Sequence, residues 1–473
     1  MMSTPTLPLD PVRASLDRSL HALAGLGGDL IAHANRIGVI LWSPPRVVIV
    51  GRLKAGKSTL VNALIGAPVA ETAALEATRL VAVYQDGAPS RAEVVGLDGT
   101  RRPIDLVRGQ PADLGVPATD IAYIHRYLPS AAIRDVTLVD TPGLATLTEA
   151  NETATRRVLI DGFEQTRTAS VDADAAVFLF DSSPRADEVA LLKQLGFTPL
   201  NTLGVLSRAD GFGEGALGQR NPIEHAHQHA RTLAAQLADT VMTVVPISGL
   251  MAETSHTGAL TEVDARTLAE LGGFAPFDLI DLLESDDTRY LTAQQRDRLV
   301  DLLGEYGIIH GRQIAARGAA ALNEWLADNS GIRPLRQILH NSVAEFASVH
   351  RAQRILLELE NLAYSHPARD HIRGIVHQVR EDPAMQPIVL FGALRSMLEA
   401  DPRSPVAAEL RRLLQGRTVA EKLGLPPEAP IQQVRAEART KLSWAQGQAL
   451  STMTAAEDAA LVTLIRTYNT LSQ

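Results

Sequence analysis

The segment 47–66 is the feature that most constrains the fold of this chain. A run of β-branched apolar residues leads directly into Gly51-x-x-x-x-Gly56-Lys57-Ser58, and a helix-forming stretch follows at once. This order of strand, glycine-rich loop and helix is what a phosphate-binding P-loop requires, because glycines let consecutive backbone N–H groups turn toward an anion. The N-terminus of the following helix adds partial positive charge. The sequence therefore predicts a nucleoside triphosphate site.

The P-loop residues divide this work between side chains and backbone. Lys57 is expected to reach the β- and γ-phosphates, and the Ser58 hydroxyl is expected to hold Mg²⁺. The remaining contacts to the nucleotide are assigned to the loop around them, namely Gly51, Leu53, Lys54, Ala55, Gly56 and Thr59.

A second motif, Asp140-Thr141-Pro142-Gly143, follows the apolar run 136–139. A carboxylate there lies at the carboxyl end of a predicted strand, where doubly wound sheets bind ligands. We expect Asp140 to hold Mg²⁺, directly or through water, and the Gly143 N–H to approach the γ-phosphate. The alternative is an ordinary turn, which the distance from the P-loop disfavours.

The base is expected to be read by Ser207-Arg208-Ala209-Asp210, which follows the apolar run 203–206. A carboxylate at Asp210 can accept hydrogen bonds from both the ring N–H and the exocyclic amine of guanine, a pair that adenine does not offer. GTPases usually carry Asn or Thr and then Lys where this chain has Ser207 and Arg208, so a plain surface loop remains the alternative. Ser248 and Gly249, after the next strand, would contribute the last contact, a backbone N–H toward the guanine O6.

Hydrolysis needs a group that senses the γ-phosphate and a group that compensates charge. Thr78 is the favoured Mg²⁺-sensing switch threonine, with Thr72 as the competitor. The glutamine that orients the attacking water in small GTPases is absent, since Leu144 follows Gly143. Lys54 is a candidate replacement, because its ammonium could lean over the β–γ bridging oxygen; the equally open alternative is that it points to solvent.

Composition narrows the possible functions further. The 473 residues carry a formal net charge of −9, which argues against nucleic acid as the main partner. The chain has no cysteine, so disulfides, zinc-thiolate sites and thiol nucleophiles are excluded. No apolar stretch approaches the ~20 residues of a transmembrane helix. We expect a cytoplasmic protein that lies, at most, peripherally at the inner face of the cell membrane.

Strand and helix signals alternate over the first part of the chain only. Apolar strand candidates occur at 80–84, 136–139, 175–180, 203–206 and 241–247, and Asp98-Gly99 predicts one antiparallel hairpin. The fold class is therefore α/β, a P-loop GTPase domain with a mostly parallel sheet covered by helices on both faces, joined to an all-α helical bundle. We predict N-terminal helices in 1–44 that pack with the C-terminal bundle, a GTPase domain in 45–345, and the bundle itself in 346–473.

Three weaker signals have structural alternatives. His225, His227 and His229 could ligate a metal, although a solvated helix face is favoured. The apolar stretch 387–392 is the best candidate for a lipid-inserting tip, although burial is favoured. Basic residues could meet lipid headgroups or simply coat a helix; they are Arg411, Arg412, Arg417 and Lys422.

Taken together, the motifs resemble those of the bacterial dynamin-like GTPases. The P-loop phrase 51–66 looks closest to that of the isoniazid-inducible dynamin-like proteins of mycobacteria, and 76–79, 140–143, 207–210 and 330–335 are similar to further motifs of that family. The resemblance implies nucleotide-dependent dimerisation of GTPase heads, either with a second copy or with a related dynamin-like partner, and work on membranes. It also implies catalytic roles for Lys57 and Thr78 and a guanine contact from Asp210. Many dynamins carry Gln-Ser in place of Leu53-Lys54, where the serine helps to hold a monovalent cation, and Lys54 could replace that cation.

The favoured function is thus Mg²⁺-dependent hydrolysis of GTP to GDP, coupled to movement of the helical bundle in membrane remodelling or maintenance. Two alternatives stay open. One is a regulatory switch of the ribosome- or tRNA-associated type, which shares the Asp-Thr-Pro-Gly motif and the missing glutamine. The other is a weakly hydrolysing scaffold.

Overall fold

The computed structural model describes residues 11–52, 54–70, 80–107, 110–111, 114–141, 173–194, 197–285 and 289–473. The chain forms two units, one made of residues 1–43 and 347–473 and the other of residues 44–346. Within the described residues, no helix combines the length and the apolar character needed to cross a bilayer. Each unit is described separately below.

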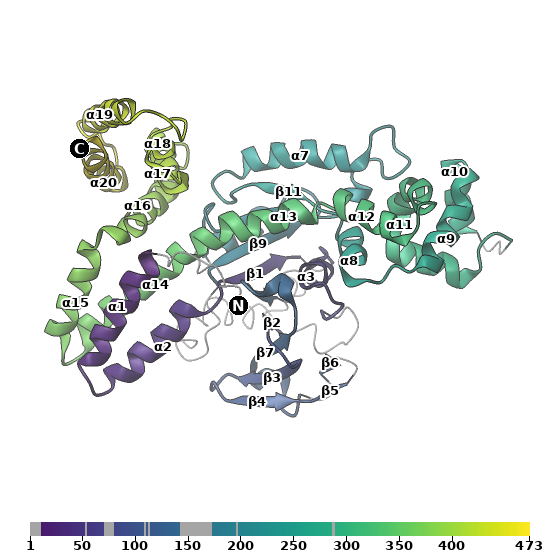
Figure 1. Ribbon diagram of the computed structural model, residues 1–473, viewed down its shortest axis with the longest axis horizontal. Coiled ribbons are helices and arrows are strands. Elements are labelled where there is room, and N and C mark those ends of the chain that lie inside the picture. Colours follow the sequence, from purple (N-terminus) through teal and green to yellow (C-terminus); the bar gives the residue numbers. More distant parts are fainter. Residues whose placement is uncertain are drawn as a thin grey trace, which may run out of the picture. The chain divides into compact units, whose positions relative to one another are not determined.

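A nine-stranded sheet forms the centre of the 44–346 unit (Figure 1). Its strands lie in the order β11-β10-β9-β1-β8-β2-β7-β3-β4. Their bounds are β1 Arg46–Gly51, β2 Ala82–Asp86, β3 Arg91–Gly96, β4 Arg101–Ile104, β7 Ile121–Leu128, β8 Thr137–Asp140, β9 Ala175–Phe180, β10 Thr202–Leu206 and β11 Val244–Pro246. A separate two-stranded ribbon joins β5 Leu106–Val107 to β6 Gln110–Pro111.

The strands from β11 to β8 run parallel, as the alternating pattern predicts. β2 pairs antiparallel with β8 and parallel with β7, and the predicted hairpin of β3 and β4 closes the far edge in antiparallel pairing. Its turn contains Gly99 in a left-handed conformation (φ 79°), which glycine adopts without strain. β7, which pairs with both β2 and β3, was not among the predicted strands.

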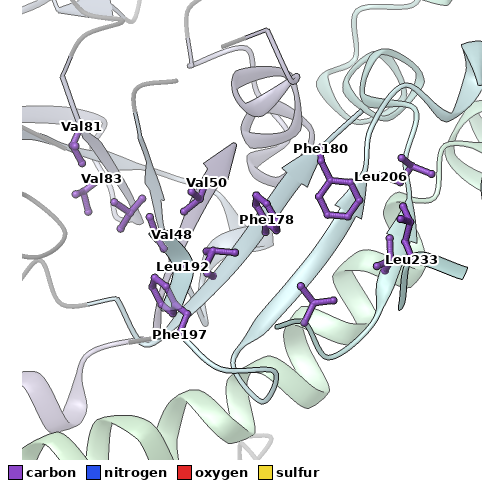
Figure 2. Packing of buried hydrophobic residues seen from close by; sticks show 14 of the residues in the cluster. Val48, Val50, Val81, Val83, Phe178, Phe180, Leu192, Phe197, Leu206 and Leu233 are labelled. Carbon is purple, nitrogen blue, oxygen red and sulfur yellow. The ribbon is translucent and has the colours of Figure 1, made fainter. Parts of the chain in front are cut away.

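Apolar side chains on one face of this sheet pack against helices. Phe178 and Phe180 of β9 meet edge to face, with ring centroids 5.2 Å apart, beside valines of β1 (Figure 2). Leu192 and Leu233 join the same cluster from α6 Ala186–Gln194 and α7 Pro222–Gln236. Each such side chain contributes about 1.5–3 kcal/mol when fully buried, so this cluster fixes the strands that carry the site.

A second core belongs to the helices after the last strand. It packs α8 Gly249–Thr257, α9 Glu262–Glu270, α10 Pro276–Glu284, α11 Ala293–Ala315 and α12 Ala319–Asn329 around buried leucines. α11 is kinked at Gly304 (φ 62°, ψ 177°), a backbone region that is essentially open to glycine alone. α13 Ile332–Ile338 follows and leads out of the unit.

The described part of the other unit contains helices and no strand. Its helices are α1 Pro11–Gly25, α2 Leu30–Trp42, α14 Ala344–Ser365, α15 Arg369–Glu381, α16 Gln386–Ala400, α17 Pro405–Gln415, α18 Val419–Lys422, α19 Ile431–Gln448 and α20 Ala455–Ser472. Ser15 and Arg18 of α1 both donate to Asp382, at 2.6 and 2.8 Å. The N-terminal helices therefore pack with the C-terminal ones, as Figure 1 shows for α1 and α15.

The three weaker signals resolve toward packing. Phe212 contacts the rings of both His225 and His229, and no metal-binding cluster occurs in the described part of the chain. The stretch 387–392 lies in α16 with Ile388 and Phe391 buried, which is the alternative that the sequence favours over a lipid-inserting tip. Arg412 pairs with Glu409 on its own helix.

Candidate nucleotide-binding site

The P-loop begins where β1 ends. A Cβ at Gly51 would lie 2.6 Å from the carbonyl oxygen of Leu179 in β9, so only glycine lets the two strands approach this closely. Gly56 then takes a left-handed conformation (φ 94°) and precedes α3 Lys57–Ile65. Strand, glycine turn and helix N-terminus therefore stand in the order that the motif predicts, and the N-terminus of a helix favours a bound anion.

Lys57 is buried within the loop that it follows. Its Nζ donates to the carbonyl oxygens of Gly51 at 3.0 Å and of Arg52 at 2.9 Å. Burial lowers the pKa of the Lys57 ammonium, and the nearby Asp140 carboxylate opposes that shift. The lysine is thereby held at the mouth of the loop, where a phosphate would meet it.

Asp140 ends β8 and stands in register with Ile49 of the neighbouring β1. Burial raises the pKa of its carboxyl group to about 6, against the opposing effects of Lys57 and of a hydrogen bond from the Ser58 hydroxyl. Its Oδ1 is buried and has no hydrogen-bond partner in the described part of the chain. Thr141 fixes the strand end by donating to the carbonyl oxygen of Ile49 at 2.7 Å.

These residues fit a magnesium ion. Mg²⁺ prefers oxygen ligands, usually one or two from the protein with the rest from water and phosphate. The unpartnered carboxylate oxygen of Asp140 and the adjacent Ser58 hydroxyl supply this kind of set.

The predicted base reader lies after β10. Asp210 is partly buried, which raises the pKa of its carboxyl group, and the Ser248 hydroxyl donates to it and opposes the rise. A Cβ on Gly304, at the kink of α11, would come within 3.8 Å of Asp210 Oδ2 and 3.3 Å of Leu250. The kink therefore brings α11 against the carboxylate without a side chain in between.

Ser207 and Arg208 make contacts that the motif does not reveal. Ser207 donates twice to the carbonyl oxygen of Phe180 in β9, from its backbone N–H at 2.8 Å and its hydroxyl at 3.3 Å. The Arg208 guanidinium donates to the carbonyl oxygen of Lys54 at 2.9 Å. Both Arg208 and Lys54 have left-handed backbones (φ 56° and 62°), and Lys54 is exposed. The base loop and the phosphate loop are thus joined directly.

The last predicted contact segment follows β11. Ser248 is fully buried and caps α8 by accepting from the N–H of Met251, while Gly249 packs against Thr59 of α3. Gly331 (φ 82°) supports the same segment, because a Cβ there would overlap the carbonyl oxygen of Pro246. The structure therefore brings together Lys57, Ser58, Asp140, Asp210 and Ser248 from four parts of the sequence.

One ion pair of this region, between Arg52 and Glu188, could not be predicted from the sequence. Arg52, inside the P-loop, pairs with Glu188 of α6 at 2.8 Å, and the Glu188 side chain is only 5% exposed. No motif surrounds Glu188, and a lone glutamate on a predicted helix carries no signal. Three predicted residues, Leu53, Thr78 and Gly143, lie outside the described residues, as does the competitor Thr72.

Comparison with known sequences gives two kinds of match. The profile of the 50S ribosome-binding GTPase family matches residues 46–202. The isoniazid-induced protein IniC of Mycobacterium tuberculosis is 30% identical, and the match covers 92% of this chain and 92% of that protein. The isoniazid-induced protein IniA of the same organism is also 30% identical, over 39% of this chain and 30% of its own length.

Among solved structures, the chain is similar to one described as an oligomerised bacterial dynamin pair. That match covers 100% of this chain and 76% of the other at 12% identity, with a TM-score of 0.34. The score is too low for any conclusion to rest on it.

Proposed function

The chain belongs to the family of the mycobacterial isoniazid-induced protein IniC, and from that premise we propose that it is a dynamin-like GTPase that hydrolyses GTP to GDP and phosphate with Mg²⁺. One observation carries the proposal. Lys57, Asp140 and Asp210 follow or end three parallel strands and meet at the carboxyl edge of one sheet. A phosphate cradle, a cation ligand and a purine reader therefore share one site.

The residues divide the reaction between them. The backbone of 51–56, the α3 N-terminus and Lys57 bind the phosphates, and Ser58 and Asp140 would hold Mg²⁺, which neutralises charge on the phosphate oxygens. Lys54 is proposed to compensate charge at the β–γ bridge, and Thr78 to position the attacking water. Both proposals come from the sequence pattern: the structure leaves Lys54 exposed, and Thr78 lies outside the described residues.

The choice of base tests this proposal most directly. We expect calorimetry with Mg²⁺ to show GTP binding much more tightly than ATP. Asp210→Asn should weaken GTP binding about 10- to 100-fold, because it removes a charged hydrogen-bond acceptor, and should leave ATP binding almost unchanged. Asp239→Asn is the matched control, since Asp239 forms a surface pair with Lys193 and lies outside this site. Equal affinity for GTP and ATP in the wild type would show that the site does not read guanine.

Work on a membrane is the second part of the proposal, and the hairpin between α19 and α20 supports it. Leu450 and Met453 are 90% and 89% exposed there, and residues 442–456 carry no charge. Exposed apolar side chains that gather at one place are one mark of a membrane contact. We therefore assign the lipid contact to this hairpin tip, in place of 387–392.

Vesicle co-sedimentation tests the hairpin tip. We expect the protein to sediment with vesicles that contain anionic phospholipid, and expect Leu450→Asp with Met453→Asp to abolish that binding without changing GTP affinity. Val389→Asp is the control, because Val389 is half-exposed on α16, within the stretch 387–392. Undiminished sedimentation of the double variant would remove the tip from the proposal.

Coupling between heads completes the proposed cycle. We propose nucleotide-dependent dimerisation of the GTPase unit, with a second copy or with a related protein of the IniA type as partner. Turnover per molecule should then rise with protein concentration, and a flat profile would contradict head dimerisation. The ribosome-binding name of the matched profile belongs to a family that aligns with residues 46–202 alone, and the net charge of −9 disfavours RNA. Sedimentation with ribosomes in place of vesicles would favour that alternative.

A further inference from the structure

The 44–346 unit contains a cavity of about 310 Å³. It lies at the ends of β1 and α3 that are opposite to the P-loop. Pro45 and Val47, at the start of β1, line it, and so does Leu64, near the end of α3. The P-loop joins the opposite ends of this strand and helix. The cavity is therefore distinct from the nucleotide site.

Most of the cavity wall is apolar. Nine of its lining residues are hydrocarbon side chains or proline, among them Val47, Ile133, Val136 and Leu138. The polar remainder consists of Arg336 from α13, with Asp135 and His340. Such a lining, apolar with a few convergent polar groups, is typical of small-molecule sites.

Arg336 is the polar group that limits what can bind. Its Nη2 donates to the carbonyl oxygens of Ala63 at 2.7 Å and of Leu64 at 3.1 Å, in the last turn of α3. Its Nε is buried without a hydrogen-bond partner, and the structure records no ion pair between Arg336 and a carboxylate of the described residues. Burial also lowers the pKa of the guanidinium.

Arg333, one turn earlier on α13, shows the contrast. Its guanidinium pairs with Glu324 and Asp328 on the surface. Capping α3 explains one nitrogen of Arg336, but leaves the buried Nε and the positive charge uncompensated. An anion would supply the missing partner of this half-buried cation, and an apolar body attached to that anion would lie against the rest of the wall.

We propose that this cavity binds a small amphiphile with one carboxylate and one hydrocarbon chain, such as a medium-chain fatty acid. The carboxylate pairs with Arg336, and the chain lies against Val47, Ile133 and Leu138. The volume stands near the lower end of the ~300–1,000 Å³ found for ligand cavities. That size suits a single chain of medium length and excludes a two-chain membrane lipid. The site does not depend on the proposed GTPase activity.

The ligand would lie near both ends of this unit's chain. Pro45 is the second residue of the unit, and His340 lies six residues before Phe346, its last residue. It would also contact the first residues of the strand that ends in the P-loop. Binding is therefore expected to raise the thermal stability of the 44–346 unit.

Calorimetry on the full chain without nucleotide tests the proposal. The probes are hexanoate, octanoate and decanoate below their micelle concentrations, with decanol as the uncharged analogue. We expect one site, about fourfold tighter binding for each added methylene until the cavity is filled, and decanol at least tenfold weaker than decanoate. Vesicles of phosphatidylglycerol should not displace decanoate. Binding that ignores chain length, no binding by decanoate, or displacement by vesicles would each overturn the proposal.

Variants assign the site within the protein. Arg336→Gln should weaken decanoate at least tenfold and leave decanol unchanged, whereas the matched control Arg333→Gln should change neither. Val136→Phe keeps Arg336 and fills the cavity, so it should weaken decanoate and decanol alike, and it decides the question if Arg336→Gln does not fold. Decanoate binding that survives Val136→Phe would place the ligand elsewhere. Separate calorimetry with GTP keeps failure here distinct from failure of the nucleotide site.

Discussion

Lys54 holds its place in the P-loop at an energetic cost. Its left-handed backbone (φ 62°) costs a residue with a side chain roughly 1–2 kcal/mol relative to glycine. A P-loop does not in general require lysine at this position, and glycine would adopt the same backbone without this cost in conformational free energy. Retaining an exposed cation here is consistent with a role for the ammonium in the reaction.

Replacing Lys54 separates the two effects. Lys54→Gly should stabilise the protein by about 1 kcal/mol and lower kcat for GTP at least tenfold, because strain and ammonium leave together. Lys54→Ala should lower kcat equally without the gain in stability, and Lys54→Arg should retain most of the activity. Chemical denaturation and single-turnover hydrolysis measure these outcomes. Unchanged turnover in the glycine and alanine variants would mean that the side chain points to solvent.

Asp140 predicts a dependence on pH. Because burial raises its carboxyl pKa to about 6, the group takes up a proton below that pH and must lose it to hold Mg²⁺. Mg²⁺-dependent GTP binding should therefore weaken as pH falls below about 6, approaching tenfold for each unit. In the nucleotide-free protein the sign is reversed: the raised pKa stabilises the fold below the unfolded value of 3.8, and this contribution is lost as pH rises through about 6.

The opposite pH dependences of GTP binding and of the stability of the nucleotide-free protein provide a control for that prediction. Asp140→Asn should remove the loss of stability between pH 4 and pH 6 that urea unfolding detects in the wild type. Mg²⁺-dependent GTP affinity that stayed constant from pH 7 to pH 5 would contradict the assignment of Asp140 as a cation ligand.

Residue types at strand ends could be predicted because the motif places them there, and Lys57, Asp140 and Asp210 are found together as expected. The partners of these residues could not. Glu188 reaches Arg52 from a helix more than a hundred residues away, and Gly304 reaches Asp210 through a helix kink. Such contacts depend on tertiary packing, which leaves no periodic trace in a single sequence.

Among the elements, the junction of β11, α8 and α13 depends on one closely packed glycine. Gly331 needs its positive φ and also leaves space for the carbonyl oxygen of Pro246, and the next residues hold Ser248 against Asp210. Backbone geometry at the start of α13 therefore supports the base pocket, although α13 contributes no group to it.

Gly331→Ala tests this support. The added Cβ is strained by the backbone and overlaps Pro246, so we expect a loss of about 2–4 kcal/mol in the free energy of unfolding. GTP affinity should fall as Ser248 shifts. Gly374→Ala, within α15 where nothing lies near the new Cβ, is the matched control and should stabilise by about 0.5–1 kcal/mol. If Gly331→Ala were as stable as the wild type, the junction would accommodate the added Cβ without strain, contrary to this prediction.

Element prediction succeeded where periodicity was strong. The parallel strands and the β3–β4 hairpin are found where the sequence predicts them. β7 was missed because it contains His125 and Arg126 amid its apolar residues. Both side chains are buried in the fold. His125 stacks on Tyr127, and Arg126 donates to the carbonyl oxygen of Val69. A polar pair at strand centre obscures the apolar pattern.

At the scale of the whole molecule, each unit buries a core of its own. The sheet and its helices enclose Phe178 and Leu303, and the helical unit encloses Leu16, Phe391 and Tyr468. Domains with separate cores usually unfold as separate cooperative units.

Scanning calorimetry should therefore resolve two transitions. A non-hydrolysable GTP analogue with Mg²⁺, at 100 times its dissociation constant, should stabilise only the transition of the 44–346 unit, by about 2.7 kcal/mol. The Asp210→Asn variant at the same analogue concentration is the control, and its 10- to 100-fold weaker binding should reduce the shift to about 0.4–1.4 kcal/mol. A single transition, or an equal shift of both, would mean that the two units fold as one.

The hydrogen bond from Arg208 to the Lys54 carbonyl has a consequence for fidelity. A nucleotide with the wrong base would leave the loop that carries Arg208 less ordered. Through this hydrogen bond the P-loop around Lys54 would be less ordered as well. Such a nucleotide would bind more weakly and would also be hydrolysed more slowly. In a cell rich in ATP this protein would therefore hydrolyse little ATP.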